Sequence, residues 1–592
     1  MKTSRCAPVA GVAEVAMGLG RRARWGPCDL DCQRDGGVLK RGGMLQQAQR
    51  KTTMDTAAGE HGRGTRTRRV AHRRDLTYQF PVYRWLSWLM VTGFAIGLGV
   101  MYLVAGMFGI PAPLGWAALV VMFCAGIALL ERPKMLLTAM MFYFLLMPSN
   151  RLFGLLGLPL PGFLDELFFI PFLAVIVMSC IQRSDVPSGR WFPVAFVAVA
   201  VLGWYVNGKP SVFGVVRVTL VMLKFWIIWY YCRLTCVFRD VDHFWKWGRL
   251  YIYYAAVQFL YNCLWQRAPW PTRHWDHSGG VFGPDGTGAA HFVGYISVLA
   301  LFLLVAWFGS EGRRATVRKK WWMGFLGIVI AYDFVFMTDT KHALLMMPVA
   351  LLLVLFHPSV SLKWKMGVAT TGLVVGLGTA AYWSVVVGRF DPVRQLMVMA
   401  DSPKGEAYMA VTKDFAYLVP YPVFGAAPGR FFSEQAITSG APLARRYVTP
   451  YSDEMARSKL AGGGTRTGGS LLASPTADML TLMGEFGWLG TALYLVFLGW
   501  VLWALLRKAS RAPSESGVNL LYLAMAGGTV FLSMTMLFAA TCTVQCVMFP
   551  WWMLIGCLWD MPYRKDKPGE VQTELPADGF PSLPGNPAES LP

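Results

Sequence analysis

Residues 480–506 read LTLMGEFGWLGTALYLVFLGWVLWALL, and this stretch decides the class of protein. Glu485 is its single charged side chain, and most of its other residues are apolar. A helix needs about 20 mainly apolar residues to cross the hydrocarbon core of a bilayer, because each residue advances the helix by about 1.5 Å. The stretch is long and apolar enough to predict a transmembrane helix.

The same pattern recurs along the chain. Of its 592 residues, 55% are hydrophobic and 15% are charged, and the mean hydropathy is +0.42, far more apolar than a soluble protein. Because lipid cannot satisfy backbone polar groups, such runs are expected to be helical. We therefore predict an all-α, polytopic transmembrane helix bundle of about 12–14 spans. The apolar runs lie near 85–108, 114–130, 134–148, 163–182, 191–207, 213–235, 244–265, 288–309, 321–338, 342–357, 366–388, 480–506, 518–541 and 545–560.

The distribution of Lys and Arg predicts the orientation of the spans. Basic residues concentrate in alternate connecting loops and in the first 80 residues, and such loops face the cytoplasm in membrane proteins. We predict the following parts, with both termini cytoplasmic: a disordered basic tail over 1–80, spans over 85–388, one large extracytoplasmic loop over 389–475, spans over 476–560, and a disordered tail over 561–592.

The net charge of +21 does not predict a nucleic-acid partner. Aromatic residues in the basic loops flank apolar runs, as in Arg190-Trp191, which is typical of a membrane interface. The eleven cysteines are thinly spread and show no disulfide framework or zinc-ligand spacing. We expect no metal and no cofactor.

Charged residues within apolar runs are the strongest functional signals, because an unpaired charge in hydrocarbon is costly. Arg217 and Lys224 lie seven residues apart and share one helical face. A common anionic ligand would explain them. The alternative is that Lys224 reaches the interface or pairs with Asp165 or Glu166.

A short polar turn, Thr338-Asp-Thr-Lys-His342, separates two apolar runs at the predicted outer face. Lys341 could bind a phosphate as a point charge, and His342 could exchange a proton near neutral pH. The alternative is a solvated turn in which Lys341 meets ordinary lipid headgroups.

Three further groups could take part in a site. Arg273 precedes the glycine-rich stretch 279–288, whose backbone amides could surround an anion. Arg430 ends the turn Val423-Phe-Gly-Ala-Ala-Pro-Gly-Arg in the large loop, and Glu485 opens the next apolar run. An ordinary turn is the alternative for both glycine-rich stretches, and Glu485 could act as a base or pair with a cation.

The chain lacks the motifs of several enzyme classes. No His-Glu-x-x-His, nucleophile elbow, phosphate-binding loop or dinucleotide fingerprint is present. Metalloproteolysis, ATP hydrolysis and nicotinamide redox chemistry therefore have no residues to support them.

The order of these motifs resembles the O-antigen ligase and polysaccharide polymerase superfamily. The shared features are a Gly-Pro-Asp loop, a Thr-x-Thr-Lys turn, a long loop containing Phe-Gly-x-x-Pro-Gly-x-Phe, and Leu-x-x-x-Gly-Glu-x-Gly-x-x-Gly at the next span. The resemblance covers about residues 85–560 and is strongest over 270–500. It implies a metal-independent glycosyltransferase on the outer face of the bacterial inner membrane.

Members of this superfamily transfer a glycan from an undecaprenyl-pyrophosphate carrier to a glycan or lipid-core acceptor. The resemblance places Lys341 where the family usually has an arginine and suggests Arg273 as a second match. The ligases usually carry a histidine nine residues before the glutamate, a position held here by Thr476, with Asp478 the nearest ionisable residue.

We therefore expect a polysaccharide polymerase or O-antigen ligase in the cell envelope, contributing to exopolysaccharide or lipopolysaccharide biosynthesis. Lys341, Arg273, Arg217 and Arg430 are the expected pyrophosphate or lipid-carrier ligands. The candidate catalytic bases are Asp478, His342 and Glu485. The expected partners are the lipid-linked donor, the acceptor and membrane lipid. A transporter or flippase of lipid-linked glycans is the main alternative, and a structural envelope protein is the third.

Overall fold

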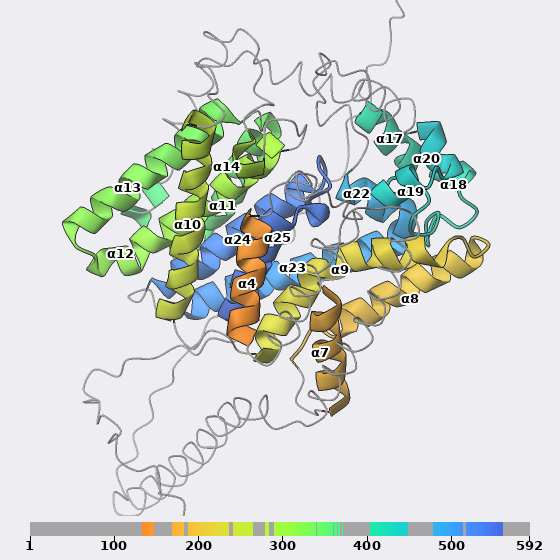
Figure 1. Ribbon diagram of the computed structural model, residues 1–592, viewed down its shortest axis with the longest axis horizontal. Helices are drawn as coiled ribbons and strands as arrows, with labels where there is room; N and C mark the ends of the chain where they lie inside the picture. The colour runs from red at the N-terminus through yellow and green to blue at the C-terminus, as the bar shows by residue number, and fades with distance from the viewer. Residues whose placement is uncertain are drawn as a thin grey trace, which may run out of the picture. The chain divides into compact units, whose positions relative to one another are not determined.

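Every described element of the computed structural model is helical (Figure 1). The chain divides into two units, Met1–Arg73 and Arg74–Pro592, and all described residues belong to the second. The described residues are 133–146, 169–182, 187–235, 241–264, 279–282, 289–370 apart from 339, 359, 364, 368 and 369, 403–447, 477–512 and 517–559.

The helices of the first half follow the predicted apolar runs. They are α4 (Pro133–Leu146), α7 (Phe169–Gln182), α8 (Trp191–Val206), α9 (Val212–Thr235), α10 (Val241–Leu264), the 3₁₀ turn η2 (Gly280–Phe282), α11 (Ala289–Gly309), α12 (Glu311–Arg314), α13 (Val317–Tyr332), the π-helical turn η3 (Asp333–Met337) and α14 (Lys341–Phe356).

The second half contains four short helices and then another group of longer ones. The short helices are α17 (Pro403–Thr412), α18 (Phe415–Leu418), α19 (Glu434–Thr438) and α20 (Pro442–Tyr447). The others are α22 (Asp478–Thr481), the π-helical turn η5 (Leu482–Phe486), α23 (Gly487–Arg511), α24 (Val518–Thr535), the 3₁₀ turn η7 (Thr541–Thr543) and α25 (Gln545–Trp559).

Five stretches of described helix are long and apolar enough to cross a membrane, which indicates a membrane protein. The predicted total of 12–14 spans stays a prediction, because the runs at 85–108 and 114–130 and most of the run at 366–388 lie outside the described residues, as do the two terminal tails. The five stretches are Val212–Thr235, His291–Gly309, Val317–Met337, Asp478–Arg511 and Val518–Thr535.

One predicted run extends past its helix. The run is predicted near 518–541, with bounds good to several residues, and α24 ends at Thr535. The chain then turns, and the hydroxyl groups of Thr535 and Thr541 lie 3.2 Å apart across the turn. The turn leaves backbone carbonyls after Thr535 available to other partners, and Tyr408, Lys404 and Asp478 donate to three of them.

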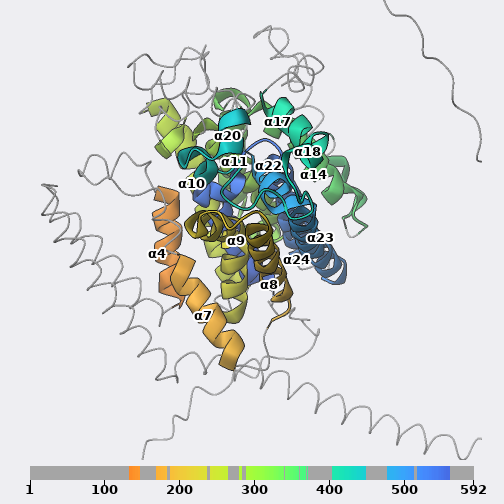
Figure 2. The same cartoon turned by 90° about the vertical axis from the view of Figure 1, so that its right-hand side faces the viewer.

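Aromatic residues fill the centre of the bundle. Helix α25 is buried over its whole length, and it packs mainly against α9. Helix α24 packs against α11, α14 and α23, and it lies beside α23 in both views of the molecule (Figures 1 and 2). The largest fully buried side chains include Trp229, Trp307, Trp551 and Trp552. Close packing of such large side chains holds the helices in fixed positions relative to one another.

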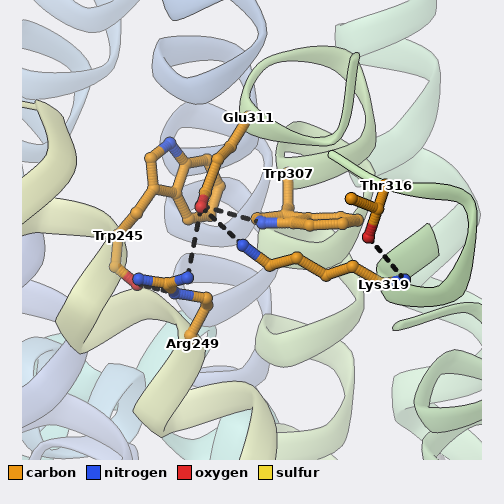
Figure 3. A network of polar contacts seen from close by, with 6 residues as sticks. All are labelled: Trp245, Arg249, Trp307, Glu311, Thr316 and Lys319. Carbon is orange, nitrogen blue, oxygen red and sulfur yellow. Dashed lines mark hydrogen bonds and ion pairs between the residues drawn. The ribbon is translucent and has the colours of Figure 1, made fainter. Parts of the chain in front are cut away.

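Basic residues gather where α9, α11, α23 and α25 end. The Glu311 carboxylate accepts hydrogen bonds from Trp307 Nε1 at 2.9 Å, Arg249 at 3.2 Å and Lys319 Nζ at 3.0 Å (Figure 3). Arg233 lies over the rings of Trp229 and Trp559, and Lys508 Nζ donates to the Trp559 carbonyl at 2.5 Å. We call this region the basic end of the bundle.

Residues 403–447 contact the starts of α9 and α23, opposite to the basic end of these helices. A small apolar cluster joins Phe415, Phe431 and Phe432 of this segment to Ala477 and Leu480. The predicted large loop, 389–475, thus contains a folded part, and its remaining residues lie outside the described structure. The location of the loop outside the membrane stays a prediction.

Candidate functional site

Asp478 is the centre of the candidate site. It begins α22 and is fully buried. Its Oδ2 accepts a hydrogen bond from the Cys542 backbone N–H at 2.7 Å, and its own N–H donates to the Ala539 carbonyl at 3.2 Å. Among the described residues, none donates to Oδ1 with hydrogen-bond geometry, although the Thr541 and Cys542 side chains also face the carboxylate. Buried carboxylate oxygens are rarely left in this state, so Asp478 is a candidate for chemistry.

His342 lies at the start of α14 and contacts Tyr295 of α11. Its Nε2 is 2.6 Å from the Tyr295 hydroxyl, and its ring centroid is 5.2 Å from that of His291. The ring also stacks on Phe538, with centroids 5.5 Å apart. Tyr295 interacts electrostatically with Asp478. The imidazole is therefore oriented by α11 and by the turn after α24.

The turn that carries His342 fits closely against α11. Thr338 Oγ1 donates to the Phe334 carbonyl at 2.8 Å and lies 2.9 Å from Thr340 Oγ1. A side chain at Gly294 would meet Thr340 Oγ1 at 2.4 Å. Glycine at position 294 therefore allows the polar turn to approach the helix, which fixes where α14 begins.

Two side chains of α17, Lys404 and Tyr408, bond to the turn after α24, which also contacts His342. Lys404 Nζ donates to the Phe538 carbonyl, and the Tyr408 hydroxyl donates to the Leu537 carbonyl at 2.7 Å. Lys404 is fully buried, and burial lowers its pKa to about 7, an effect that the negative charge of Asp478 partly offsets. Burial and Asp478 also raise the pKa of Tyr408. The Lys404 ammonium and the Asp478 carboxylate are thus close enough to interact electrostatically.

We call Asp478, His342, Tyr295, Lys404 and Tyr408 the carboxylate site. These residues come from α22, α14, α11 and α17, and the turn after α24 joins them through its carbonyls and through Phe538. The arrangement combines a carboxylate oxygen that could accept a proton, an oriented imidazole and a lysine that could bind an anion.

Glu485 lies seven positions after Asp478 in the sequence, and its carboxylate accepts more backbone hydrogen bonds. Its Oε1 accepts backbone N–H bonds from Phe431 at 2.9 Å and Ser433 at 2.8 Å, and its Oε2 accepts one from Gly429 at 2.5 Å. Three backbone amides thus surround one fully buried carboxylate. We call Glu485 with residues 425–435 the glutamate clasp, because it ties this stretch to the start of α23.

Glycines allow the clasp to close. Gly425 and Gly487 both have positive φ, at 75° and 68°. A Cβ on Gly487 would meet the Gly425 nitrogen at 2.3 Å. The Ala426 N–H donates to the Gly484 carbonyl at 2.9 Å, so the two backbones touch here. Any side chain at either glycine would separate them.

The two arginines predicted to bind an anion are next to the clasp. Arg217 on α9 donates to Gln435 Oε1 at 2.6 Å, and Arg430 donates to the Asn207 carbonyl at 3.1 Å. Asn207 in turn donates to the Gly425 carbonyl at 2.9 Å. Both arginines therefore connect the helices to residues 425–435. Lys224 is buried and lies over the Phe169 ring at 5.5 Å.

The glycine-rich stretch after Arg273 is described only at 279–282. Its Gly280 N–H donates to Asn262 Oδ1 at 2.7 Å and its Val281 N–H donates to Gln258 Oε1 at 2.9 Å. Side chains of α10 thus occupy these two amides, which fits the ordinary turn, and the rest of the stretch, 283–288, lies outside the described residues. Asn262 also donates to the buried Asp333 at 2.9 Å.

The structure brings together some of the predicted residues. Asp478 and His342 share the carboxylate site, whereas Glu485, Arg217 and Arg430 belong to the clasp region. The N-terminal residue of α14 is Lys341, whose side chain lies outside the described structure, as does all of Arg273.

Sequence reasoning missed Lys404, Tyr408 and Tyr295. The signal for Tyr295 was its position one helical turn after His291 in an apolar run. Lys404 lies in an ordinary polar stretch, and nothing in its sequence surroundings marks it.

Within the described part of the chain, no group of three or more His, Cys, Asp or Glu residues could hold a metal ion. Comparison with protein-family models, with curated proteins and with solved structures finds no match to this chain.

Proposed function

We propose that the chain is a membrane glycosyltransferase that polymerises or ligates undecaprenyl-pyrophosphate-linked glycans. The observation that supports this most is the carboxylate site. There, Asp478 Oδ1 has no hydrogen-bond donor among the described residues, and the buried Lys404 interacts electrostatically with Asp478. A base for a hydroxyl group and a cation for a pyrophosphate are the two groups that this reaction needs. The motif order within residues 270–500 supports the same assignment.

In the proposed step, Asp478 is the base. The acceptor hydroxyl gives its proton to Oδ1 as its oxygen attacks the anomeric carbon of the donor sugar. The bond between that carbon and the pyrophosphate oxygen breaks, and the carrier pyrophosphate leaves with the electron pair. A single displacement of this kind inverts the anomeric configuration.

Asp478 is a better candidate base than the two other residues. The oxygens of Glu485 already accept three backbone hydrogen bonds, and His342 Nε2 is engaged by Tyr295. In the proposal, His342 orients the acceptor. General bases of this type contribute about 10²- to 10⁴-fold to the rate.

The proposed ligands of the leaving pyrophosphate are Lys404, Lys341 and Arg273. Their charge would stabilise the negative charge that develops as the sugar departs. Arg217 and Arg430 would support this step indirectly, because they hold the stretch 425–435 in place.

We place the carboxylate site at the outer face of the bacterial inner membrane. The basic end of the bundle contains Arg233, Arg249, Lys319 and Lys508, and basic residues favour the cytoplasmic side. The carboxylate site and residues 403–447 contact the opposite helix ends. Both termini would then be cytoplasmic.

Reconstitution of the purified protein into vesicles with a lipid-linked glycan donor tests the proposal. We expect new glycosidic bonds, detected by mass spectrometry of the products, and their loss in Asp478→Asn. The matched control is Glu311→Gln at the basic end, which should retain transfer. Movement of the carrier lipid across the bilayer without new glycosidic bonds would indicate a transporter and contradict the proposal.

A further inference from the structure

Two helices present apolar faces that no described element covers. On α8, Val194, Val201 and Tyr205 are exposed, and on α23, Val496 and Trp503 are exposed. The two helices pack against each other, so these exposed side chains lie on neighbouring helices. In a membrane protein, lipid chains cover such apolar faces.

Residues 417–423 extend these faces beyond the helices. The Trp488 N–H donates to the Pro422 carbonyl at 3.3 Å, and the Leu489 N–H donates to the Val423 carbonyl at 3.1 Å. The segment therefore lies level with the first turn of α23. The residue that follows, Phe424, approaches α8: its carbonyl oxygen lies 2.8 Å from the position that a Cβ on Gly203 would take.

The exposed side chains of this region are mainly amphipathic aromatics. Tyr417 is 90% exposed, Tyr421 50% and Trp488 46%. Tyr205 is 62% exposed, and Lys209 Nζ lies 5.0 Å from its ring centroid. Tyrosine and tryptophan with a nearby lysine are typical of the level at which acyl chains meet headgroups.

We propose that a membrane-anchoring patch, formed by Tyr205, Tyr417, Tyr421, Val423, Trp488 and Leu489, inserts at the headgroup boundary of the bilayer. Its partner is a lipid surface, because the patch continues the lipid-facing sides of α8 and α23. Lys209 favours anionic headgroups beside it. The part of the large loop that the glutamate clasp holds is thereby anchored to the membrane as well as to the helices, and this holds whatever reaction the chain performs.

Site-specific photo-crosslinking tests this proposal in the full-length protein. The photoreactive residue p-benzoylphenylalanine replaces Tyr417 in one variant, Tyr421 in a second, and the exposed Arg445 of α20 as a control. The protein is reconstituted in nanodiscs made of phosphatidylglycerol and phosphatidylethanolamine and then irradiated.

We expect mass spectrometry to find lipid adducts at positions 417 and 421 at least fivefold more often than at 445. Because the probe is itself aromatic, it should preserve folding, which near-native elution in gel filtration checks. Equal lipid labelling at 417, 421 and 445 would overturn the proposal. So would crosslinking of positions 417 and 421 to a second copy of the chain in place of lipid.

Discussion

The two buried carboxylates at the start of the stretch 478–511 differ in how they are bonded. Glu485 accepts hydrogen bonds from the backbone of Gly429, Phe431 and Ser433. Asp478 accepts one such bond with full hydrogen-bond geometry, from Cys542, while Thr541 and the Cys542 side chain face the carboxylate without donating to Oδ1 in that geometry. Only seven residues separate them.

On this difference we base the proposal of a structural role for Glu485 and a reactive role for Asp478. The three backbone donors occupy lone pairs of the Glu485 carboxylate and hold it in one position. A buried carboxylate with an open oxygen is unusual enough to need an explanation, and chemistry is one. We infer that Glu485 holds residues 425–435 in place and that Asp478 acts on the substrate.

The largest expected effect is that of Asp478→Asn on transfer. The amide keeps the shape of the side chain but cannot accept the hydroxyl proton. We expect kcat to fall by about 10²- to 10⁴-fold, with little change in the thermal unfolding midpoint. Single-turnover assays on reconstituted protein would measure this, and a variant with full kcat would remove Asp478 from the chemistry.

Glu485→Gln should act on stability instead. The substitution removes the charge from three hydrogen bonds and places an amide N–H₂ opposite backbone donors. We expect the free energy of unfolding to fall by about 2–4 kcal/mol, with transfer by the folded fraction reduced much less. Thermal unfolding and limited proteolysis of residues 403–447 would measure it. Unchanged protease resistance would show that the clasp does not hold this segment.

Gly487→Ala tests the backbone contact of the clasp. With φ at 68° and the Gly425 nitrogen 2.3 Å from the new Cβ, the two backbones must separate. We expect a loss of about 1–3 kcal/mol in the free energy of unfolding. Gly499→Ala in the same helix is the matched control, because nothing lies within 4 Å of its Cβ position. Alanine there should stabilise the protein by about 0.5–1 kcal/mol.

Lys404 should make donor binding depend on pH. Burial lowers its pKa from 10.5 to about 7, so the ammonium loses its proton as the pH rises through that value. We expect the KM for the lipid-linked donor to rise about threefold to tenfold between pH 6 and pH 8. Lys404→Arg stays charged and should show a flat KM. If KM rose equally with pH in the wild-type protein and in Lys404→Arg, Lys404 would be excluded as the cause of the pH dependence.

The smallest expected effect is that of Glu311→Gln at the basic end. Its ion pairs with Arg249 and Lys319 are partly exposed to solvent, and exposed pairs of this kind contribute about 1 kcal/mol or less. We expect a fall of that size in the free energy of unfolding and no change in transfer. A large loss of transfer would show that the basic end takes part in the reaction.

Sequence patterns predicted the helices well because membrane spans are defined by long runs of apolar residues. The exception was the run 518–541, which remains apolar past the point where α24 ends at Thr535. Hydropathy cannot detect such an end, because the turn after Thr535 is stabilised by hydrogen bonds from distant side chains, including Tyr408.

The site was predicted only in part, because bonding partners come from remote parts of the chain. Sequence placed Asp478 and Glu485 as equal candidates for a base, and their hydrogen bonds distinguish them. The sequence pattern did not identify Lys404, because this side chain is buried only where α17 packs against the turn after α24. A polar stretch alone does not reveal such a contact.

The most direct test of the central claim compares Asp478→Asn and Glu485→Gln side by side in vesicles with a lipid-linked glycan donor. Transfer per folded molecule and the thermal unfolding midpoint are measured on the same samples. We expect Asp478→Asn to lose transfer and keep its unfolding midpoint, and Glu485→Gln to unfold at a lower temperature and keep most of its transfer per folded molecule. The opposite pattern, with Glu485→Gln inactive but stable and Asp478→Asn active, would contradict it.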